Sequence, residues 1–170
     1  MGSIRVGQPY QVQGGVERAP QLGGRRQSLT GREPELSGLR ALLLPPLIVH
    51  LDDDDILLAL ISLAVRRLRS YRVESFVAAE DALAFCRAMR PAVLITDVLR
   101  PDIDGLSLCG LIRADSVLSD LPLMIHSAWM GAASQVKALG AVFVSKPCDP
   151  HSFCDQLDSL VQIGLERHRS

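Results

Sequence analysis

Residues 91–105 of the chain read Pro91-Ala-Val-Leu-Ile-Thr-Asp97-Val-Leu-Arg-Pro101-Asp-Ile-Asp104-Gly105. The first half is a proline followed by a short apolar run, which is typical of a strand buried on both faces. The run ends in a carboxylate, Asp97, and the segment after it holds the proline, aspartate and glycine residues that favour a turn. Strands buried on both faces occur mainly in parallel sheets covered by helices, so the stretch predicts an α/β protein.

The same alternation of short apolar runs and longer segments of helical period extends along the chain from Leu47 onward. It is the pattern of repeated strand–helix units around a parallel sheet. Because such crossovers are right-handed, we predict a doubly wound, five-stranded parallel sheet with helices on both faces, in three layers. The expected strands are Leu47–Leu51, Arg72–Val77, Ala92–Thr96, Leu123–His126 and Val142–Val144, and the expected helices are Ile56–Arg69, Ala79–Met89, Leu106–Ala114, Ala132–Leu139 and Pro150–Leu165.

Length and charge limit the class of protein. The 170 residues suffice for one domain, and a content of 48% apolar and 22% charged residues is that of a globular protein with a buried core. The net charge of −1 gives no general attraction to polyanions. We therefore expect neither nucleic acid nor a membrane surface as a partner of the domain.

The first 40 residues differ in composition from the rest. They hold six arginines against three acidic residues, whereas residues 41–170 hold twelve basic and sixteen acidic residues. We expect residues 1–40 to form a disordered basic tail and residues 47–165 to form the domain. The four cysteines lack the spacing of a metal site, and no apolar run is long enough to span a bilayer, so we expect reduced thiols and a cytoplasmic location.

Polar residues follow the ends of the predicted strands. Asp52 to Asp55 follow the first strand, Asp97 ends the third, Ser127 follows the fourth, and Lys146 comes shortly after the fifth. Ligands of open α/β sheets gather outside the carboxyl ends of the strands. We therefore expect these side chains to form one site.

The run of four aspartates has two explanations. Neighbouring carboxylates about 4 Å apart repel each other by about 1 kcal/mol in water, so something must compensate the charge. One or two of them could cap the following helix, which is worth about 0.5–2 kcal/mol. Alternatively, they could hold Mg²⁺ together with Asp97, because Mg²⁺ prefers a few carboxylate oxygens and retained waters.

Four motifs, in register along the chain, resemble those of response-regulator receiver domains, the CheY-like superfamily of two-component phosphorelay systems. They are the stretch 91–105, the acidic group after the first strand, Ser127-Ala128 after the fourth strand and Lys146-Pro147 after the fifth. The resemblance covers about residues 47–165. It implies the CheY-like, flavodoxin-like (βα)5 fold.

The resemblance also implies a phosphoacceptor and a metal site. Asp97 would take a phosphoryl group from the phosphohistidine of a sensor histidine kinase or a histidine phosphotransfer protein. Asp52, Asp53, Asp97 and the backbone carbonyl of Leu99 would bind Mg²⁺. Phosphoryl transfer needs mainly alignment and neutralisation of charge, which agrees with such a set of residues.

Further roles implied by the resemblance belong to residues after the fourth and fifth strands. Ser127 and Lys146 would bind phosphoryl oxygens, and Phe143 matches the position of the family's switch aromatic, although it could equally fill space beside the last strand. Trp129, two residues after Ser127, and the apolar Leu99 are expected to hinder the approach of a water molecule to the phosphorylated Asp97. Hydrolysis of the phosphorylated aspartate is then expected to be slow.

Two departures from the family's pattern alter these expectations. The acidic loop is one residue short, so the acidic pair is either Asp52 and Asp53 or Asp53 and Asp54. The segment between Ser127 and Lys146 is about three residues short, close to one helical turn. The fourth helix is therefore expected to be stunted, which puts in question the dimer face that this helix commonly helps to form.

The main functional prediction is a stand-alone receiver that signals by phosphorylation-dependent binding and is no dedicated enzyme. The alternative is a pseudo-receiver that kept the fold but is phosphorylated weakly or not at all. A phosphatase of the haloacid dehalogenase type also uses a strand-end aspartate with Mg²⁺. That class needs a second aspartate two residues on, where this chain has Leu99.

Two features lie outside these roles. Residues 56–65 are more apolar than a helix with one solvated face needs, so this helix either faces a partner or is buried against the last helix or the N-terminal tail. His50 and His126 fall within strands and are expected to be hydrogen-bonded core histidines without a catalytic role.

Overall fold

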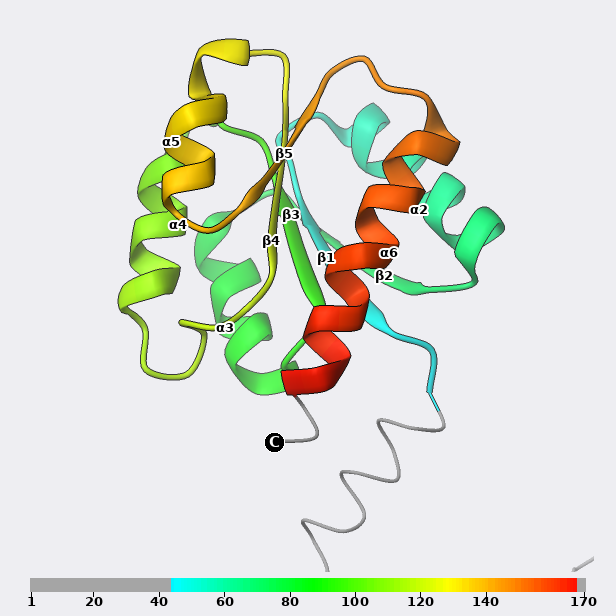
Figure 1. Cartoon of the computed structure of the whole chain (residues 1–170), viewed down its shortest axis with the longest axis horizontal. Coiled ribbons are helices and arrows are strands. Elements are labelled where there is room, and N and C mark those ends of the chain that lie inside the picture. The colour runs from blue at the N-terminus through cyan, green and yellow to red at the C-terminus, as the bar shows by residue number, and fades with distance from the viewer. Residues whose placement is uncertain (1–43, 168–170) are drawn as a thin grey trace, which may run out of the picture. The chain divides into compact units, whose positions relative to one another are not determined.

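The computed structural model describes residues 44–167, and the expected tail, residues 1–40, lies outside this range. The described part is one parallel sheet between two layers of helices, which confirms the predicted fold class (Figure 1). None of its helices is long and apolar enough to cross a membrane. The elements are β1 (Leu47–Leu51), α2 (Asp55–Arg69), β2 (Arg72–Phe76), α3 (Ala79–Met89), β3 (Val93–Thr96), α4 (Gly105–Ala114), β4 (Leu123–Ser127), the 3₁₀ helix η2 (Met130–Ala132), α5 (Ala133–Ala138), β5 (Val142–Ser145) and α6 (Pro150–Arg167).

The strand order of the sheet is β2-β1-β3-β4-β5, and every neighbouring pair is parallel. The chain moves from β1 outward to β2 and then returns past β1 to β3, so the direction of winding reverses between β1 and β3. A reversal of this kind opens a crevice at the carboxyl ends of the two central strands. The site described below lies at this point.

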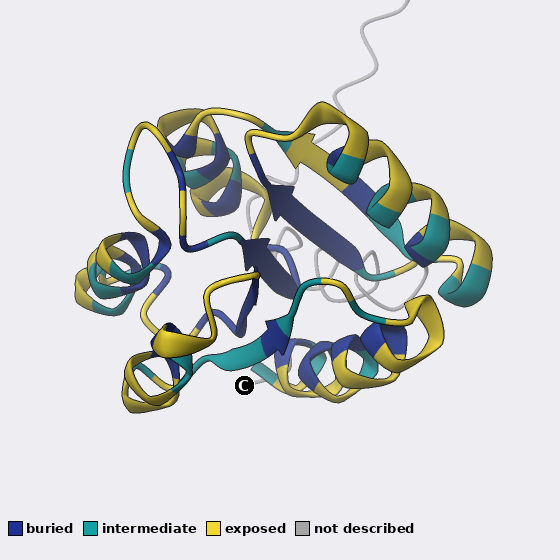
Figure 2. Cartoon of the chain, turned by 90° about the horizontal axis from the view of Figure 1, so that it is seen from above, coloured by how far each residue is buried: buried dark blue, intermediate teal, exposed yellow. Residues whose placement is uncertain are grey.

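Each face of the sheet has its own hydrophobic core, because successive side chains of a strand point to opposite faces. Figure 2 shows the buried central strands between helices whose outer surfaces are largely exposed. The core under α3, α4 and α5 includes Val49, Leu51, Leu94, Leu123 and Ile125. The core under α2 and α6 includes Ile48, Ile95, Met124, Phe153 and Val161.

Aspartates mark the starts of three helices. Asp54 accepts hydrogen bonds from the N–H groups of Ile56 and Leu57, at 2.9 and 3.1 Å, and Asp104 caps α4 in the same way. At the start of α6, the carboxylate of Asp149 accepts from the N–H of Ser152 at 2.9 Å. These caps satisfy N–H groups that have no partner within the helix.

The segment between β4 and β5 differs from the single helix predicted for residues 132–139. It consists of the short 3₁₀ helix η2 followed by α5, which has only six residues. A Cβ atom added at Gly131 would lie 2.8 Å from Nε1 of Trp129, so the indole packs directly on the backbone of η2. The expectation of a stunted fourth helix is confirmed.

Candidate functional site

The register of the sheet brings the predicted strand-end residues together. Leu51 of β1 is paired with Thr96 of β3, so Asp52 and Asp97, which follow them, emerge side by side. On the other side of β3, Ser127 of β4 is paired with Ser145 of β5, directly before Lys146. The backbone N–H of Lys146 donates to the carbonyl of Ser127 at 2.9 Å. The predicted edge of the sheet therefore carries a cluster of acidic, hydroxyl and ammonium groups.

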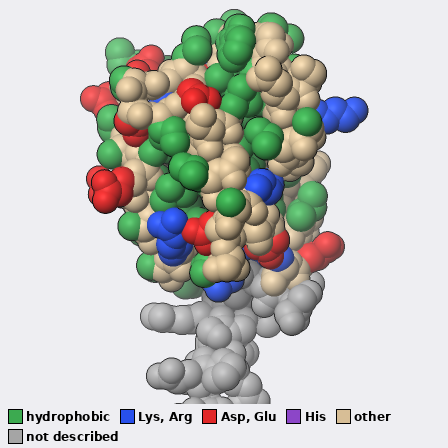
Figure 3. All heavy atoms as spheres, turned by 90° about the vertical axis from the view of Figure 1, so that its left-hand side faces the viewer, with side chains coloured by type: hydrophobic (Ala, Val, Ile, Leu, Met, Phe, Trp, Pro, Cys, Tyr) green, Lys and Arg blue, Asp and Glu red, His purple; other side chains and the backbone are tan. Residues whose placement is uncertain are grey.

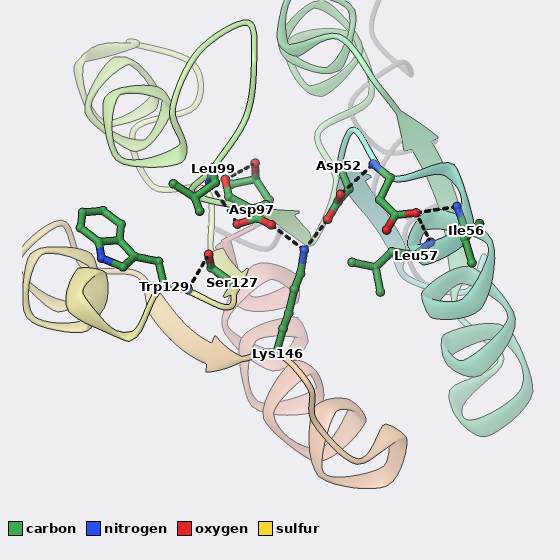
Figure 4. A network of polar contacts seen from close by, with 10 residues as sticks. Asp52, Ile56, Leu57, Asp97, Leu99, Ser127, Trp129 and Lys146 are labelled. Atoms are coloured by element: carbon green, nitrogen blue, oxygen red, sulfur yellow. Dashed lines mark hydrogen bonds and ion pairs between the residues drawn. The ribbon is translucent and has the colours of Figure 1, made fainter.

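Lys146 is held between the two central carboxylates (Figure 4). Its Nζ lies 2.8 Å from Oδ2 of Asp52 and 2.6 Å from Oδ2 of Asp97. The side chain of Asp52 is 1% exposed and that of Asp97 13% exposed. The ammonium compensates two carboxylates that would otherwise repel each other in a largely buried place.

The second oxygen of each carboxylate is bound by its own loop. Oδ1 of Asp52 accepts from the N–H of Asp54 at 3.0 Å, and Oδ1 of Asp97 accepts from the N–H of Leu99 at 3.1 Å. Both carboxylates are thus oriented by backbone donors while their other oxygens face the same cation. Such orientation fixes the groups before any ligand binds.

The pKa values of Asp97 and Lys146 favour their charged forms. Burial raises the pKa of Asp97, but hydrogen bonds from Lys146, Ser127 and the N–H of Leu99 outweigh it and hold the pKa below its usual value. Burial likewise lowers the pKa of Lys146, and its hydrogen bonds to Asp52 and Asp97 raise the pKa above its usual value. Asp97 is therefore an ionised carboxylate at neutral pH.

The four aspartates after β1 have separate environments. Asp52 is buried and faces Lys146, whereas Asp54 caps α2. Asp53 and Asp55 are exposed to solvent. The capping explanation therefore holds for Asp54, and the charge of Asp52 is compensated by Lys146, because successive residues of an extended loop point in different directions.

Apolar side chains flank one side of Asp97. Leu99 is 62% exposed and Trp129 44% exposed, and Figure 4 shows both on the side of Asp97 away from Asp52. The N–H of Trp129 donates to Oγ of Ser127 at 3.3 Å, and Ser127 itself is buried. Figure 3 shows further hydrophobic side chains at the upper end of the face formed by α4 and α5, where η2 lies in Figure 1.

Phe143 is half-buried in β5 and packs against the core under α3, α4 and α5. It precedes Lys146 by three residues, so the two side chains belong to one strand and the loop after it.

The donors at the site fit a magnesium ion. Asp52 and Asp97 each offer one oxygen to a single cation, which in this structure is the ammonium of Lys146. Across residues 44–167, no three or more His, Cys, Asp or Glu side chains converge as a metal site. Mg²⁺ commonly binds through only one or two carboxylates and keeps several waters, so two converging carboxylates suffice for it.

Two histidines lie buried beneath the site. His50 in β1 and His126 in β4 are 0% and 3% exposed, and the ring of His126 packs edge-on against Phe153 at a centroid distance of 5.0 Å. Neither ring has a hydrogen-bond partner among the described residues. Burial in the core is as predicted, but the predicted hydrogen bonds are wrong, because no described donor or acceptor lies within hydrogen-bond distance of either ring.

One structural residue of the loop after Asp97 was not predicted from the sequence. The side chain of Arg100 is fully buried, and its Nη2 donates to the carbonyl of Val77 at 2.6 Å and to Oδ1 of Asp102 at 2.8 Å. Asp102 also caps α3 through the N–H of Ala79 at 2.8 Å. An arginine two residues before an aspartate in this loop is the sequence signal for such a pair.

The fold and this edge of the sheet define a class: a doubly wound α/β protein with a strand-end aspartate, a paired lysine and a buried serine. The sequence model of the response regulator receiver domain matches residues 48–158, well over half of the chain. The chain therefore belongs to the response regulator receiver domain family. Proteins of this family accept a phosphoryl group on an aspartate in two-component signalling.

Individual relatives agree with this assignment. The chain is 31% identical over 83 residues to the transcriptional regulatory protein AfsQ1 of Streptomyces coelicolor, covering 49% of this chain and 35% of that protein. It is 28% identical to CseB of the same organism, covering 60% of this chain and 43% of CseB. The chain thus spans less than half the length of these relatives.

Solved structures show the same architecture. A response regulator from Chloroflexus aurantiacus J-10-fl is similar with a TM-score of 0.65 and 28% identity, covering 69% of this chain and 98% of that one. The chemotaxis response regulator CheY4 of Vibrio cholerae has a TM-score of 0.62 at 23% identity, covering 68% of this chain and 98% of CheY4, and shows the fold alone.

Proposed function

We propose that Asp97 is the phosphoacceptor of this receiver domain and takes its phosphoryl group from the phosphohistidine of a sensor histidine kinase or a histidine phosphotransfer protein. The observation that carries the proposal is the contact of 2.6 Å between Oδ2 of Asp97 and Nζ of Lys146 at the carboxyl edge of the sheet. The carboxylate is ionised, oriented and partly accessible. These are the requirements for a nucleophile in phosphoryl transfer.

In the transfer, an oxygen of the Asp97 carboxylate attacks phosphorus, and the bond between phosphorus and the imidazole nitrogen of the donor breaks. The imidazole leaves with the bonding electron pair. The ammonium of Lys146 then neutralises charge on the phosphoryl oxygens. The hydroxyl of Ser127 donates to the Asp97 carboxylate while its Oγ accepts from the N–H of Trp129, and the same proton could be donated to a phosphoryl oxygen.

Mg²⁺ would be held by Asp52, Asp53, Asp97 and the backbone carbonyl of Leu99. Bound there, it would neutralise charge on the transferring phosphoryl group. The alternative pair of Asp53 and Asp54 is less favourable, because the carboxylate of Asp54 is committed to the start of α2. The buried Asp52 instead faces the point where the carboxylates converge.

The phosphorylated domain would signal by binding a partner. A phosphoryl group on Asp97 attracts Lys146 and Ser127, and it thereby favours one arrangement of the loops after β4 and β5. The side chain of Phe143 would change its position with these loops and thereby alter the surface at β5. The exchange is proposed to occur in the cytoplasm, which the four unpaired cysteines of the described part support.

The proposal is tested by incubating the full chain with Mg²⁺ and a small acyl phosphate and locating the adduct by mass spectrometry. We expect one phosphoryl adduct on the peptide that contains Asp97. Asp97→Asn should lose it, because the amide is no nucleophile. Asp81→Asn, a change at an exposed aspartate of α3, is the matched control and should keep it.

Two results would contradict the proposal. One is the absence of any adduct on the unaltered chain in the presence of Mg²⁺. The other is an adduct that forms equally in Asp97→Asn, since the phosphoryl group would then reside elsewhere. Absence of the adduct would favour the alternative of a pseudo-receiver.

A further inference from the structure

The loop after Asp97 is anchored by buried side chains on both sides of Leu99. Val98 is 1% exposed and belongs to the core under α3, α4 and α5, and the side chain of Arg100 is fully buried. Leu99 lies between them and is 62% exposed, so its side chain does little to hold its own backbone in place. The course of the chain at Leu99 therefore depends on its two neighbours.

Arg100 joins this loop to the segment that follows β2. Its Nη2 donates to the carbonyl of Val77 at 2.6 Å and to Oδ1 of Asp102 at 2.8 Å. The other carboxylate oxygen of Asp102 accepts from the N–H of Ala79, at the start of α3, at 2.8 Å. Hydrogen bonds with a charged partner are stronger than those between neutral groups, so the guanidinium and the carboxylate tie the two loops together.

The peptide unit between Leu99 and Arg100 carries the carbonyl that we propose as a ligand of Mg²⁺. This carbonyl is bonded to the backbone nitrogen of Arg100, and because a peptide unit is planar the two move as one body. The N–H of Leu99, on the preceding peptide unit, donates to Oδ1 of Asp97 at 3.1 Å. The anchored side chain of Arg100 therefore restricts the rotation of the unit that bears the carbonyl.

Other contacts of the loop hold its two ends and not its middle. The N–H of Gly105 donates to the carbonyl of Val98 at 2.8 Å, and a Cβ atom at Gly105 would lie 2.2 Å from the carbonyl oxygen of Asp97. These contacts place the start of α4 beside the phosphoacceptor. Among residues 99–103, Arg100 alone is buried, so it is the anchor of the stretch between those ends.

The burial of this guanidinium contributes little to stability. Nε and Nη1 of Arg100 have no hydrogen-bond partner among the described residues, and a buried ion pair with incomplete hydrogen bonding rarely stabilises a fold more than apolar groups of the same size would. Holding the loop in one position is a role that such a costly contact can serve.

We propose that Arg100 is a positioning residue of the magnesium site, which fixes the carbonyl of Leu99 beside Asp97 before the metal binds. The inference rests on the proposed function of Asp97 and on the Mg²⁺ ligands named with it. Residues that orient metal ligands without touching the metal commonly change its affinity by about 10–100-fold. Arg100 touches neither the ion nor the phosphoryl group in this role, so it acts on Mg²⁺ affinity and not on the chemistry at Asp97.

The first test is a titration of the full chain with Mg²⁺ alone, followed by the fluorescence of Trp129. We expect Arg100→Ala to raise the Kd for Mg²⁺ by about tenfold. Arg66→Ala is the matched control, because Nη2 of Arg66 donates to the carbonyl of Val73 in β2, also at 2.6 Å, but near the opposite end of that strand. The control should bind Mg²⁺ as the unaltered chain does, and circular dichroism confirms that each variant is folded.

Arg100→Lys tests whether a polar anchor is what the loop needs. Its ammonium keeps one charged donor in place of the planar fork of the guanidinium, so its Kd should lie between those of the unaltered chain and Arg100→Ala. This comparison also applies if Arg100→Ala does not fold, since a Kd in Arg100→Lys equal to that of the unaltered chain would then overturn the proposal.

Phosphorylation by an acyl phosphate separates metal affinity from chemistry. In Arg100→Ala, the Mg²⁺ concentration that gives half the maximal rate should rise by the same factor as the Kd. The rate at saturating Mg²⁺ should stay within about twofold of that of the unaltered chain, because Asp97 and Lys146 are unchanged. A role of Arg100 in folding alone would move neither the Kd nor this concentration in the folded protein.

Two results would overturn the proposal while leaving the role of Asp97 intact. One is an equal Kd for Mg²⁺ in Arg100→Ala and the unaltered chain. The other is a lower rate at saturating Mg²⁺ with an unchanged Kd. An unaltered chain that binds no Mg²⁺ would instead contradict the proposed metal site itself, and this inference with it.

Discussion

Lys146 is the residue on which the electrostatics of the site depend. Its ammonium binds Asp52 and Asp97 at 2.8 and 2.6 Å, where a bound divalent cation would also neutralise them. The lysine and a bound metal ion would therefore compete for the same oxygens. We therefore expect the lysine to affect metal affinity, in addition to its proposed contact with the phosphoryl group.

We predict that Lys146→Met raises the pKa of Asp97 and tightens Mg²⁺ binding. Removing one positive charge from beside two carboxylates should change the affinity by about tenfold, or about 1.4 kcal/mol. The fluorescence of Trp129, the single tryptophan of the chain, reports Mg²⁺ binding in a titration. Unchanged or weaker Mg²⁺ binding in Lys146→Met would contradict the prediction. Phosphorylation of Asp97 by an acyl phosphate should decrease in this variant even though Mg²⁺ binds more tightly.

Trp129 and Leu99 are predicted to slow the loss of the phosphoryl group from Asp97. Both are apolar and partly exposed beside the carboxylate, where they would hinder an attacking water. Trp129→Ala should speed hydrolysis by up to about tenfold, or about 1.4 kcal/mol in the barrier. The rate is measured as the loss of label from the isolated phosphorylated protein, and Leu111→Ala serves as the control. Equal rates in the unaltered chain, Trp129→Ala and Leu111→Ala would refute the prediction.

At the scale of elements, two glycines within helices have opposite surroundings. A Cβ atom at Gly110 of α4 would contact nothing within 4 Å, whereas one at Gly164 of α6 would lie 2.1 Å from the carbonyl oxygen of Ala92. Alanine has a higher helix propensity than glycine by about 1 kcal/mol. The absence of a side chain at Gly164 thus allows α6 to pack directly on the start of β3.

We predict that Gly110→Ala raises the free energy of unfolding by about 0.5–1 kcal/mol and that Gly164→Ala lowers it by about 1–3 kcal/mol. The first change gains helix propensity at no steric cost, while the second forces backbone atoms apart. Urea denaturation of the two variants measures both values. Equal effects of the two substitutions would show that α6 does not approach β3 this closely.

The Arg100–Asp102 pair joins the loop after β3 to the start of α3. Nε and Nη1 of Arg100 are buried without a partner among the described residues, so the guanidinium is incompletely compensated. Replacing a buried charged pair by apolar groups is often neutral or stabilising, while removing one partner is costly.

Because the side chain of Asp102 is 36% exposed and can be hydrated, Arg100→Met leaves no buried charge behind and should leave the free energy of unfolding unchanged or raise it slightly. Asp102→Ala should lower it by about 2–3 kcal/mol, because the change leaves a buried guanidinium unpaired and removes the cap on Ala79. Denaturation of the single and double variants measures this, and the double variant should be more stable than Asp102→Ala. A less stable double variant would contradict the account.

At the scale of the whole molecule, two buried histidines make stability depend on pH. Burial lowers the pKa of His50 and of His126 to about 4, whereas the unfolded value is about 6.5. Between these values the unfolded chain binds more protons than the folded chain. The free energy of unfolding therefore falls as the pH falls from about 6.5 to about 4 and is independent of these groups above that range.

Each histidine should cost about 2 kcal/mol of stability between about pH 7 and about pH 5. Denaturant unfolding at the two pH values measures the loss. His126→Leu keeps an apolar side chain against Phe153 and should remove about half of the pH dependence. The same loss in the variant as in the unaltered chain would show that other groups cause it.

The sequence alone determined the fold class, the order of the elements and the edge of the sheet on which the polar groups gather. The hydrophobic period and the turn residues are local properties of the sequence, so strands such as Leu47–Leu51 were predictable without coordinates. Parallel strands place their carboxyl ends at one edge of the sheet, so the position of the polar groups was predictable as well. The same reasoning placed Asp97, Ser127 and Lys146 at one site.

Only the tertiary structure decided which groups meet there. The choice between Asp52 and Asp54 depends on the direction of successive side chains in one short loop, and the position of Lys146 between two carboxylates depends on the register of three strands. The burial of Arg100, the replacement of part of a helix by η2 and the exposure of α2 arise from contacts between distant segments. Such contacts depend on the packing of whole elements, which no local pattern of residues contains.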